Sequence, residues 1–203
     1  MIQNKSKSSK IGRPRQFDSE AALDAATEVF WLKGYDGASL DDLTAAMNIN
    51  RPSLYLAFKD KQSLFLSSLE SYASSYGTAP LLAFNAEADP MAAVKSYFTT
   101  LVRNQTREGE CAKGCLLSSC ATSNAEQILG VKEFLANVAA HTIIELVNGF
   151  ESFKLAGALA NEFASKTKAS LMVDISHGFA YRSRYGETFD ALMTDVDEKT
   201  TQV

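Results

Sequence analysis

The sequence predicts an all-α protein, and three observations support that prediction. Apolar side chains recur three and four positions apart along most of the 203 residues, and no stretch has the two-residue alternation of a strand. Hydrophobic residues make up 46% of the chain, which is enough for a sizeable core and excludes wholesale disorder. No apolar run approaches the roughly 20 residues that a membrane helix needs. We therefore expect a soluble, cytoplasmic, helical protein.

Charge is distributed unevenly along the chain. The net charge is −4, but residues 1–61 carry nine Lys or Arg against eight Asp or Glu, whereas residues 62–203 carry eleven against sixteen. The first sixteen residues hold five basic side chains and no acidic one, namely Lys5, Lys7, Lys10, Arg13 and Arg15. Residues 1–16 are thus predicted to form a flexible basic arm, which either only solubilises the chain or contacts DNA.

The first predicted helix is an ordinary amphipathic one. It runs from Asp18 to about Lys33, its apolar side chains lie on one wide face, and Gly34 ends it. Asp18 or Ser19 can cap its first turn by accepting backbone N–H bonds. This helix carries no function by itself.

Two short helices joined by a tight turn are predicted next. Ser39 and Asp42 have the spacing of a capping box, at the start of a helix barely two turns long. Asn48 then tolerates the left-handed backbone that a turn requires. A second helix follows, with Asn50 as its cap and Pro52 in its first turn, where a missing N–H costs little.

The second of these helices has an outer face suited to DNA. Leu54 and Phe58 point inward at a spacing of four, which leaves Arg51 and Tyr55 outside with Lys59 beyond them. This arrangement has the geometry of a helix-turn-helix, whose second helix reads base edges in the major groove. An αα-corner inside a helical bundle is the alternative, but a bundle interior would not gather these polar side chains on one surface.

The run GRPRQFDSEAALDAATEVFWLKGYDGASLDDLTAAMNINRPSLYLAFKDKQSLF, residues 12–65, resembles the N-terminal DNA-binding domain of the TetR family of bacterial transcriptional repressors. The most telling pieces are the GRPR arm, the VF and GY steps that lead into Leu40, the PSLY and Phe58 of the second short helix, and the Lys59-Asp60-Lys61 step into the next helix. One departure is Asn48, which stands where the family usually has glycine.

The resemblance implies a division of the chain and a set of partners. Residues 17–61 would be a three-helix DNA-binding domain, and residues 62–203 a helical effector-binding and dimerisation domain. A homodimer would bind a palindromic double-stranded operator and leave it when a small molecule binds. The residues implied at the DNA are Arg13, Arg15, Ser39, Asn50, Arg51, Pro52, Ser53, Tyr55, Lys59 and Lys61.

Beyond residue 61 the periodicity predicts helices over 61–76, 90–107, 115–123, 131–153, 159–184 and 187–196, with Gly77 and Pro80 ending the first. The side chains expected around an effector are Phe98, Thr99, Val102, Cys115, Cys120, Phe134, His141 and Glu145. Those expected between two subunits are Leu171, Ile175, Gly178, Phe179, Arg182, Phe189, Leu192, Met193 and Val196. The apolar stripes that hold the latter could equally be core of a single chain.

The three cysteines, Cys111, Cys115 and Cys120, allow a second hypothesis. Cys115 follows Gly114 at a helix start, where the helix dipole lowers a thiol pKa, so the second hypothesis is a thiol-based electrophile or redox sensor of the same fold. The alternative is that all three are small buried side chains. Spacings of four and five do not fit a zinc site, and no catalytic or nucleotide-binding motif occurs. We expect no metal, no cofactor and no enzymatic activity, although a helical enzyme or adaptor stays open as another class.

Overall fold

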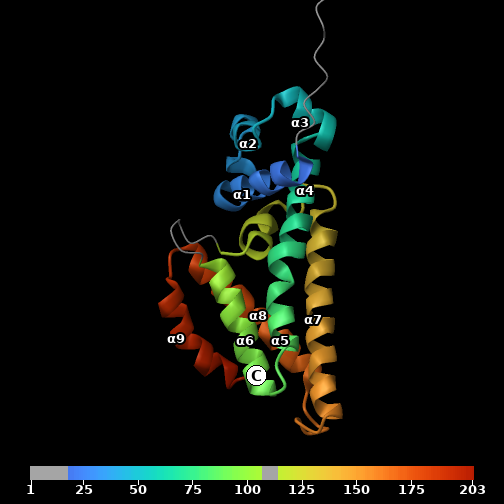
Figure 1. The fold of residues 1–203 in the computed structure, drawn as a ribbon, viewed down its shortest axis with the longest axis vertical. Helices are drawn as coiled ribbons and strands as arrows, with labels where there is room; N and C mark the ends of the chain where they lie inside the picture. Colours follow the sequence, from blue (N-terminus) through green and yellow to red (C-terminus); the bar gives the residue numbers. More distant parts are fainter. Residues whose placement is uncertain (1–17, 107–113) are drawn as a thin grey trace, which may run out of the picture.

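The computed structural model describes residues 18–106 and 114–203, and these residues fold into helices (Figure 1). The basic arm, with Arg13 and Arg15, and Cys111 lie outside the described residues. The α-helices are α1 (Ser19–Gly37), α2 (Leu40–Ala46), α3 (Arg51–Phe58), α4 (Lys61–Tyr72), α5 (Ala79–Asn85), α6 (Pro90–Gln105), α7 (Val131–Leu155), α8 (Ser165–Arg184) and α9 (Phe189–Thr200). Two π-helical segments, η1 (Ala73–Gly77) and η2 (Leu116–Ala121), and the 3₁₀ turn η3 (Thr122–Asn124) complete the described elements.

The molecule is elongated, with α1 to α3 at one end and α5 to α9 at the other (Figure 1). Helix α4 runs from the small end into the larger body and packs closely on α1. In the body, α5 packs on α6, α7 on α8, and α9 on α6. The predicted all-α class is confirmed over the described part of the chain. Among those same residues, no helix is long and apolar enough to cross a membrane.

Local capping explains where the first helices begin and end. The Asp18 carboxylate accepts the backbone N–H of Glu20 at 3.0 Å, as expected for the cap of α1. Gly34 has φ 70° and ψ 176°, so it breaks the helical geometry inside α1, as its residue type predicts. Ser39 and Asp42 form the predicted capping box, because Ser39 Oγ accepts the Asp42 N–H at 3.0 Å and Asp42 accepts the Ser39 N–H at 3.0 Å.

The turn between α2 and α3 also follows the sequence signals. Asn48 has φ 51°, the left-handed conformation that its side chain tolerates. Asn50 caps α3, since its Oδ1 accepts the Ser53 N–H at 2.9 Å. Leu43 and Leu54 are fully buried and hold the two short helices onto the same core. The helix-turn-helix is therefore fixed by two caps, one left-handed residue and two leucines.

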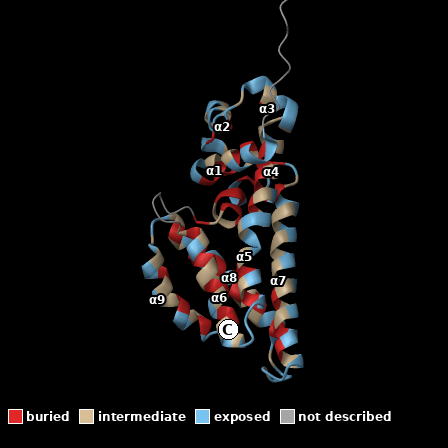
Figure 2. Ribbon diagram, viewed as in Figure 1, coloured by how far each residue is buried: buried red, intermediate tan, exposed pale blue. Residues whose placement is uncertain are grey.

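Two hydrophobic clusters form the core (Figure 2). The first joins α1 to α4 with the segment around η2 and the start of α7, and its buried members include Phe30, Trp31, Leu43, Leu54, Phe65, Leu116 and Val131. The second fills the body between α5 and α9, with Phe84, Phe98, Val102, Leu146, Phe150 and Phe179 among its members. The first cluster crosses the boundary at residues 61 and 62 that the resemblance implies, so the two-part division remains a proposal.

Several predicted boundaries are wrong. Pro80 does not end a helix but lies in the first turn of α5, a helix that the sequence reading missed. Since proline fits the first turn of a helix as well as the end of one, it marks a boundary without giving its direction. The predicted helix over 159–184 begins only at Ser165, and that over 115–123 is η2 followed by η3.

Three of the side chains expected between subunits lie instead in the core of the single chain. Phe179, Leu192 and Val196 are almost fully buried within the second cluster, so they have no surface left for a partner. Helix α9 turns its apolar stripe to α6, which a period of 3.6 residues alone does not reveal. Arg182 is likewise engaged within the chain, with Glu187 and Asp195, each at 2.5 Å.

The close approach of α7 to α5 gives a test of core packing. A Cβ at Gly149 would stand 2.4 Å from Cε1 of Phe84, which is itself buried and packs edge-on against Phe150. Gly149→Ala is expected to lower the free energy of unfolding by about 1–3 kcal/mol, despite alanine's better helix propensity. Urea denaturation measures this. Gly77→Ala is the control, because the nearest atom there is 3.9 Å away; equal losses in both variants would contradict the packing.

The capping box gives a test in pH. Hydrogen bonds from Lys33 and then Ser39 lower the pKa of Asp42 from 3.8 to about 2. Because the folded pKa lies below the usual value, the contribution of Asp42 to stability is fully present above about pH 4 and is lost as the pH falls toward 2. A carboxyl ¹³C titration of the protein is expected to give a midpoint near 2, and a midpoint at the usual value would show that neither the Lys33 pair nor the box is formed.

Candidate nucleic-acid interface and the adjoining cavity

The outer face of α3 is open to solvent. Arg51 and Pro52 are exposed in its first turn, Tyr55 is 46% exposed and Leu56 is 89% exposed. Leu54 between them is fully buried, so the helix is held from behind and its other side is left free. Leu56 is an exposed apolar side chain that was not among the residues expected at DNA.

Arg51 is positioned by an ion pair across the turn. Its Nη2 lies 2.7 Å from Oδ1 of Asp41, and both side chains are largely exposed. The hydrogen bond with Asp41 raises the pKa of Arg51, which stays a cation. An exposed pair of this kind contributes little to stability because water competes with it. The guanidinium is therefore held near the surface of α3 and remains available to an external acceptor.

The other residues expected at DNA surround α3. Ser39 and Asn50 are exposed at the starts of α2 and α3, where both already act as helix caps. Ser53 is half-buried in the first turn of α3. Lys59 is exposed and has φ 70° at the end of α3, which ends the helix sharply. Lys61 is half-buried, with its Nζ 4.2 Å from the centre of the Tyr35 ring, and burial lowers its pKa.

A large cavity lies in the body directly behind the first cluster. Its volume is about 950 Å³, and its walls come from α4, both π-helical segments, α5, α6, α7 and α8. Such a size falls within the range of small-molecule sites. Most of the wall is apolar, and the rings of Tyr72, Tyr76, Tyr97 and Phe134 contribute to it. Burial raises the pKa of Tyr97 to about 12, so its hydroxyl stays protonated and donates or accepts hydrogen bonds.

The structure brings three of the eight expected effector-pocket residues to this cavity. Cys115, Phe134 and His141 line it, whereas Phe98, Val102 and Cys120 are buried in the two core clusters. Thr99 faces a shallow depression on the other side of α6, and Glu145 lies outside the cavity wall.

Helix α6 meets the cavity with a neighbouring face of its surface. The residues that line it are Tyr97, Leu101, Asn104 and Gln105. Tyr97 and Leu101 each precede an expected residue, Phe98 and Val102, and lie about 100° away from it around the helix. A signal for this face existed in the sequence. Gln105 is a polar residue four positions after Leu101, on a stripe that is otherwise apolar.

The surroundings of the described cysteines do not favour a thiol sensor. Cys120 is buried, its Sγ lies 3.7 Å from the carbonyl oxygen of Trp31, and burial raises its pKa, which disfavours the reactive thiolate. Cys115 is half-buried in the cavity wall, beside the buried Tyr72 hydroxyl.

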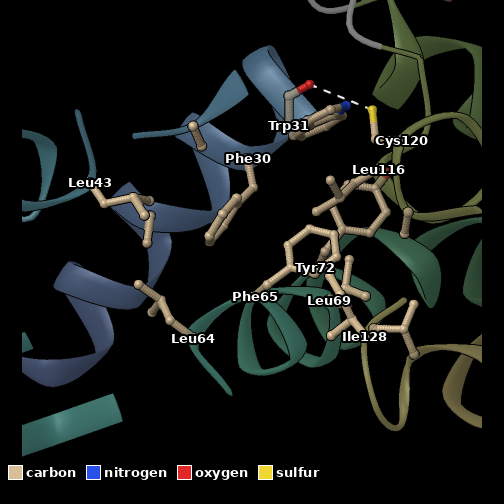
Figure 3. Packing of buried hydrophobic residues seen from close by; sticks show 14 of the residues in the cluster. Phe30, Trp31, Leu43, Leu64, Phe65, Leu69, Tyr72, Leu116, Cys120 and Ile128 are labelled. Carbon is tan, nitrogen blue, oxygen red and sulfur yellow. Dashed lines mark hydrogen bonds between the residues drawn. The ribbon is translucent and has the colours of Figure 1, made fainter. Parts of the chain in front are cut away.

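A junction around Trp31 joins α1 to α4 and to the segment that carries η2 (Figure 3). The indole is fully buried, and its ring centre lies 4.8 Å from that of Tyr72 and 5.2 Å from that of Tyr76. Its Nε1 donates to the carbonyl oxygen of Gly114 at 3.1 Å. Because both tyrosines also line the cavity, one layer of rings separates the cavity from α1.

The end of α8 holds the same part of α1. The Arg184 guanidinium donates to the carbonyl oxygens of Trp31 at 2.7 Å and Leu32 at 3.3 Å. These carbonyls belong to the turn before Gly34, where the helical geometry is interrupted. A further tie is the hydrogen bond from Asn124 to the Asp36 carboxylate, at 3.0 Å. The helix-turn-helix end of the molecule is thus held to the body by side chains of the α4–η1 segment, of α8 and of η3.

Comparison with known proteins agrees with this geometry. Residues 22–67 match the family described as "Bacterial regulatory proteins, tetR family". HTH-type transcriptional repressor ComR of Escherichia coli strain K12 is 33% identical over 112 residues, which cover 55% of this chain and 53% of ComR. HTH-type transcriptional repressor BdcR of the same strain is 26% identical over 182 residues, covering 89% of this chain and 86% of BdcR. The chain spans about half the length of the first two curated relatives that it matches.

A solved structure extends the likeness to nearly the whole chain. It is a cysteine mutant of the TetR family transcriptional regulator CifR in complex with 26-base-pair double-strand operator DNA. CifR is 27% identical, superposes with a TM-score of 0.85, and the match covers 94% of this chain and 98% of that one. The matched segment contains the helix-turn-helix built from Ser39, Asn48 and Asn50, and the body carries the same helical architecture. Residues 22–67 are therefore a DNA-binding domain of the TetR family, and the chain as a whole is similar to TetR family regulators in sequence and in fold.

Proposed function

We propose that the protein is a DNA-binding transcriptional repressor that acts in the cytoplasm as a homodimer on a palindromic operator. The observation that carries this proposal is the free outer face of α3, where Arg51, Tyr55 and Leu56 are exposed over a buried Leu54. The similarity to CifR, whose structure includes operator DNA, supports the same conclusion.

The proposed contacts follow from the chemistry of each side chain. Arg51 exchanges its exposed partner Asp41 for a guanine edge, to which a guanidinium binds with two parallel hydrogen bonds. Pro52 contacts a thymine methyl group, while Ser53 and Tyr55 donate to phosphates. Ser39, Asn50, Lys59 and Lys61 lie around α3 and bind the backbone on either side. Arg13 and Arg15 of the arm enter the neighbouring minor groove.

The second copy is proposed to dock on α8. Along this helix the chain leaves a stripe uncovered that includes Gly178, Tyr181 and Tyr185, and a Cβ at Gly178 would have no heavy atom within 4 Å. Leu171, Ile175, Phe189 and Met193 are only partly buried and remain candidates for the same interface. A twofold pair would present two α3 helices to successive turns of the duplex, roughly 34–36 Å apart.

Release is proposed to begin in the cavity. An effector that contacts Tyr72 and Tyr76 bears on the two rings against which Trp31 packs, and Trp31 lies at the end of α1. The effector is proposed to bind more tightly to an arrangement in which the two α3 helices do not fit the operator. The free energy of operator binding is then weakened by the difference between the effector's binding free energies in the two arrangements.

Selection of duplexes from a random library tests the proposed function directly. The purified protein is expected to enrich an inverted repeat, and the affinity is expected to fall steeply with salt because basic side chains displace counterions. Enrichment of no sequence, or of one without twofold symmetry, would contradict the proposal.

The role of Arg51 is tested on the selected duplex. Arg51→Ala is expected to weaken binding by about 1–3 kcal/mol, since it removes a bidentate base contact, and to relax specificity at one base pair of each half-site. Arg103→Ala is the matched control, because Arg103 is an exposed arginine on α6 in the body. Equal affinities of the two variants in a gel-shift titration would remove Arg51 from the contacts.

The proposed interface is tested at Gly178. Gly178→Arg is expected to leave the chain folded, because the position is exposed and helical, but to dissociate the dimer by placing a charged side chain where two α8 helices meet. Ala136→Arg, at an exposed position on α7, serves as control. Analytical ultracentrifugation distinguishes the states, and an intact dimer in Gly178→Arg would rule out this face.

A further inference from the structure

We propose that the cavity binds an uncharged, largely apolar molecule that donates a hydrogen bond to the side-chain oxygen of Gln105. The inference deepens the proposed function, and it rests on that function only for the claim that the bound molecule acts as effector.

Gln105 provides the observation that carries the inference. It is the last residue of α6, lines the cavity and is only 4% exposed. Its backbone carbonyl accepts the N–H of Gly114 at 3.2 Å, which fixes the residue in place. Its side-chain Oε1 is buried and has no hydrogen-bond partner among the described residues. Since buried amide oxygens almost always accept a hydrogen bond, this oxygen can accept one from a molecule bound in the cavity.

A second unpaired group belongs to the same wall. Ser118 Oγ in η2 is buried and also lacks a partner within residues 18–106 and 114–203, and Ser118 lines the cavity. The hydrogen bond from Gly114 to Gln105 places the start of the segment that carries η2 beside the end of α6. The wall around these two residues therefore offers hydrogen-bonding capacity, and tyrosine and phenylalanine rings supply apolar surface elsewhere in the wall. A molecule with one polar end and a broad apolar body matches this distribution.

The charges around the cavity favour an uncharged occupant. No lysine or arginine occurs among the described residues that line it, and Glu70, the carboxylate among them, is exposed. His141 and His177 also stand at exposed positions. An ionised carboxylate or phosphate in the interior would lose its hydration without a cation to replace it, which is a large penalty. The described walls thus select against anions and for neutral donors such as hydroxyl or amide groups.

Three probes with one aromatic body test the inference. The probes are 1-pyrenemethanol, which carries a donor, 1-methylpyrene, which carries none, and 1-pyrenecarboxylate, which is an anion. Binding is followed without DNA through quenching of Trp31, the only tryptophan of the chain, by energy transfer to pyrene. We expect 1-pyrenemethanol to bind about five- to tenfold more tightly than 1-methylpyrene, and the carboxylate to bind most weakly. Equal binding of the first two, or preference for the anion, would overturn the proposal.

Gln105→Leu assigns the donor preference to this residue. The substitution keeps the approximate size and removes the unpaired oxygen, so the preference for 1-pyrenemethanol over 1-methylpyrene is expected to disappear while 1-methylpyrene binds as before. Gln127→Leu makes the same exchange at an exposed position outside the cavity and is expected to keep the preference. A preference that survives in Gln105→Leu contradicts the assignment, and the three-probe comparison on the wild-type chain decides the matter even if that variant does not fold.

Failure here is distinguishable from failure of the proposed function. If the donor preference is absent but an inverted repeat is still selected, the protein remains a DNA-binding repressor with a different occupant. If 1-pyrenemethanol binds through Gln105 and no duplex is selected, the cavity inference stands and the regulatory role falls.

Discussion

The packing of Trp31 is the interaction on which the rest of the structure depends. Its indole is buried between the helix-turn-helix and the body, in ring contact with Tyr72 and Tyr76. Arg184 of α8 donates to the carbonyl oxygens of Trp31 and Leu32, where Gly34 interrupts the helix. These contacts define how the outer face of α3 is oriented relative to α8. Without them, the helix-turn-helix would be joined to the body by α4, by the rest of the first cluster and by the hydrogen bond from Asn124 to Asp36.

This junction gives physical content to the proposed regulation. The cavity and the proposed dimer face share α8, which contributes Ser176, His177 and Tyr181 to the cavity wall and Arg184 to the end of α1. A molecule in the cavity therefore contacts both elements that orient the helix-turn-helix, α4 through Tyr72 and α8 through Ser176. A coupling of a few kcal/mol between two sites needs only a difference in the contacts made in two arrangements. The two π-helical segments, both in the cavity wall, are the kind of local irregularity common at binding sites.

The features of the fold that the sequence predicts correctly are those set by residues close together in the chain. The caps at Asp18, Ser39 and Asn50 and the left-handed Asn48 were predicted, because each depends on hydrogen bonds or sterics within four residues. The packing partner of each apolar helix face was not predicted, since a 3.6-residue period shows that a face is buried but does not show which element covers it. Leu192 and Val196 were therefore assigned to a partner although they pack in the chain's own core, and α6 was turned about 100° toward the wrong face. Pro80 was expected to end the preceding helix although it lies in the first turn of α5, because proline is common both in the first turn of a helix and just after its last residue.

Hydrogen–deuterium exchange of the amides at residues 31–37 in Arg184→Met tests the central claim most directly. The substitution keeps an apolar stem and removes the donors to the Trp31 and Leu32 carbonyls. If the junction holds the end of α1, exchange there accelerates while α6, α7 and α9 keep their protection, and operator affinity falls although α3 is untouched. Unchanged exchange at residues 31–37 would contradict the account, because the orientation of the helix-turn-helix would then not depend on this contact.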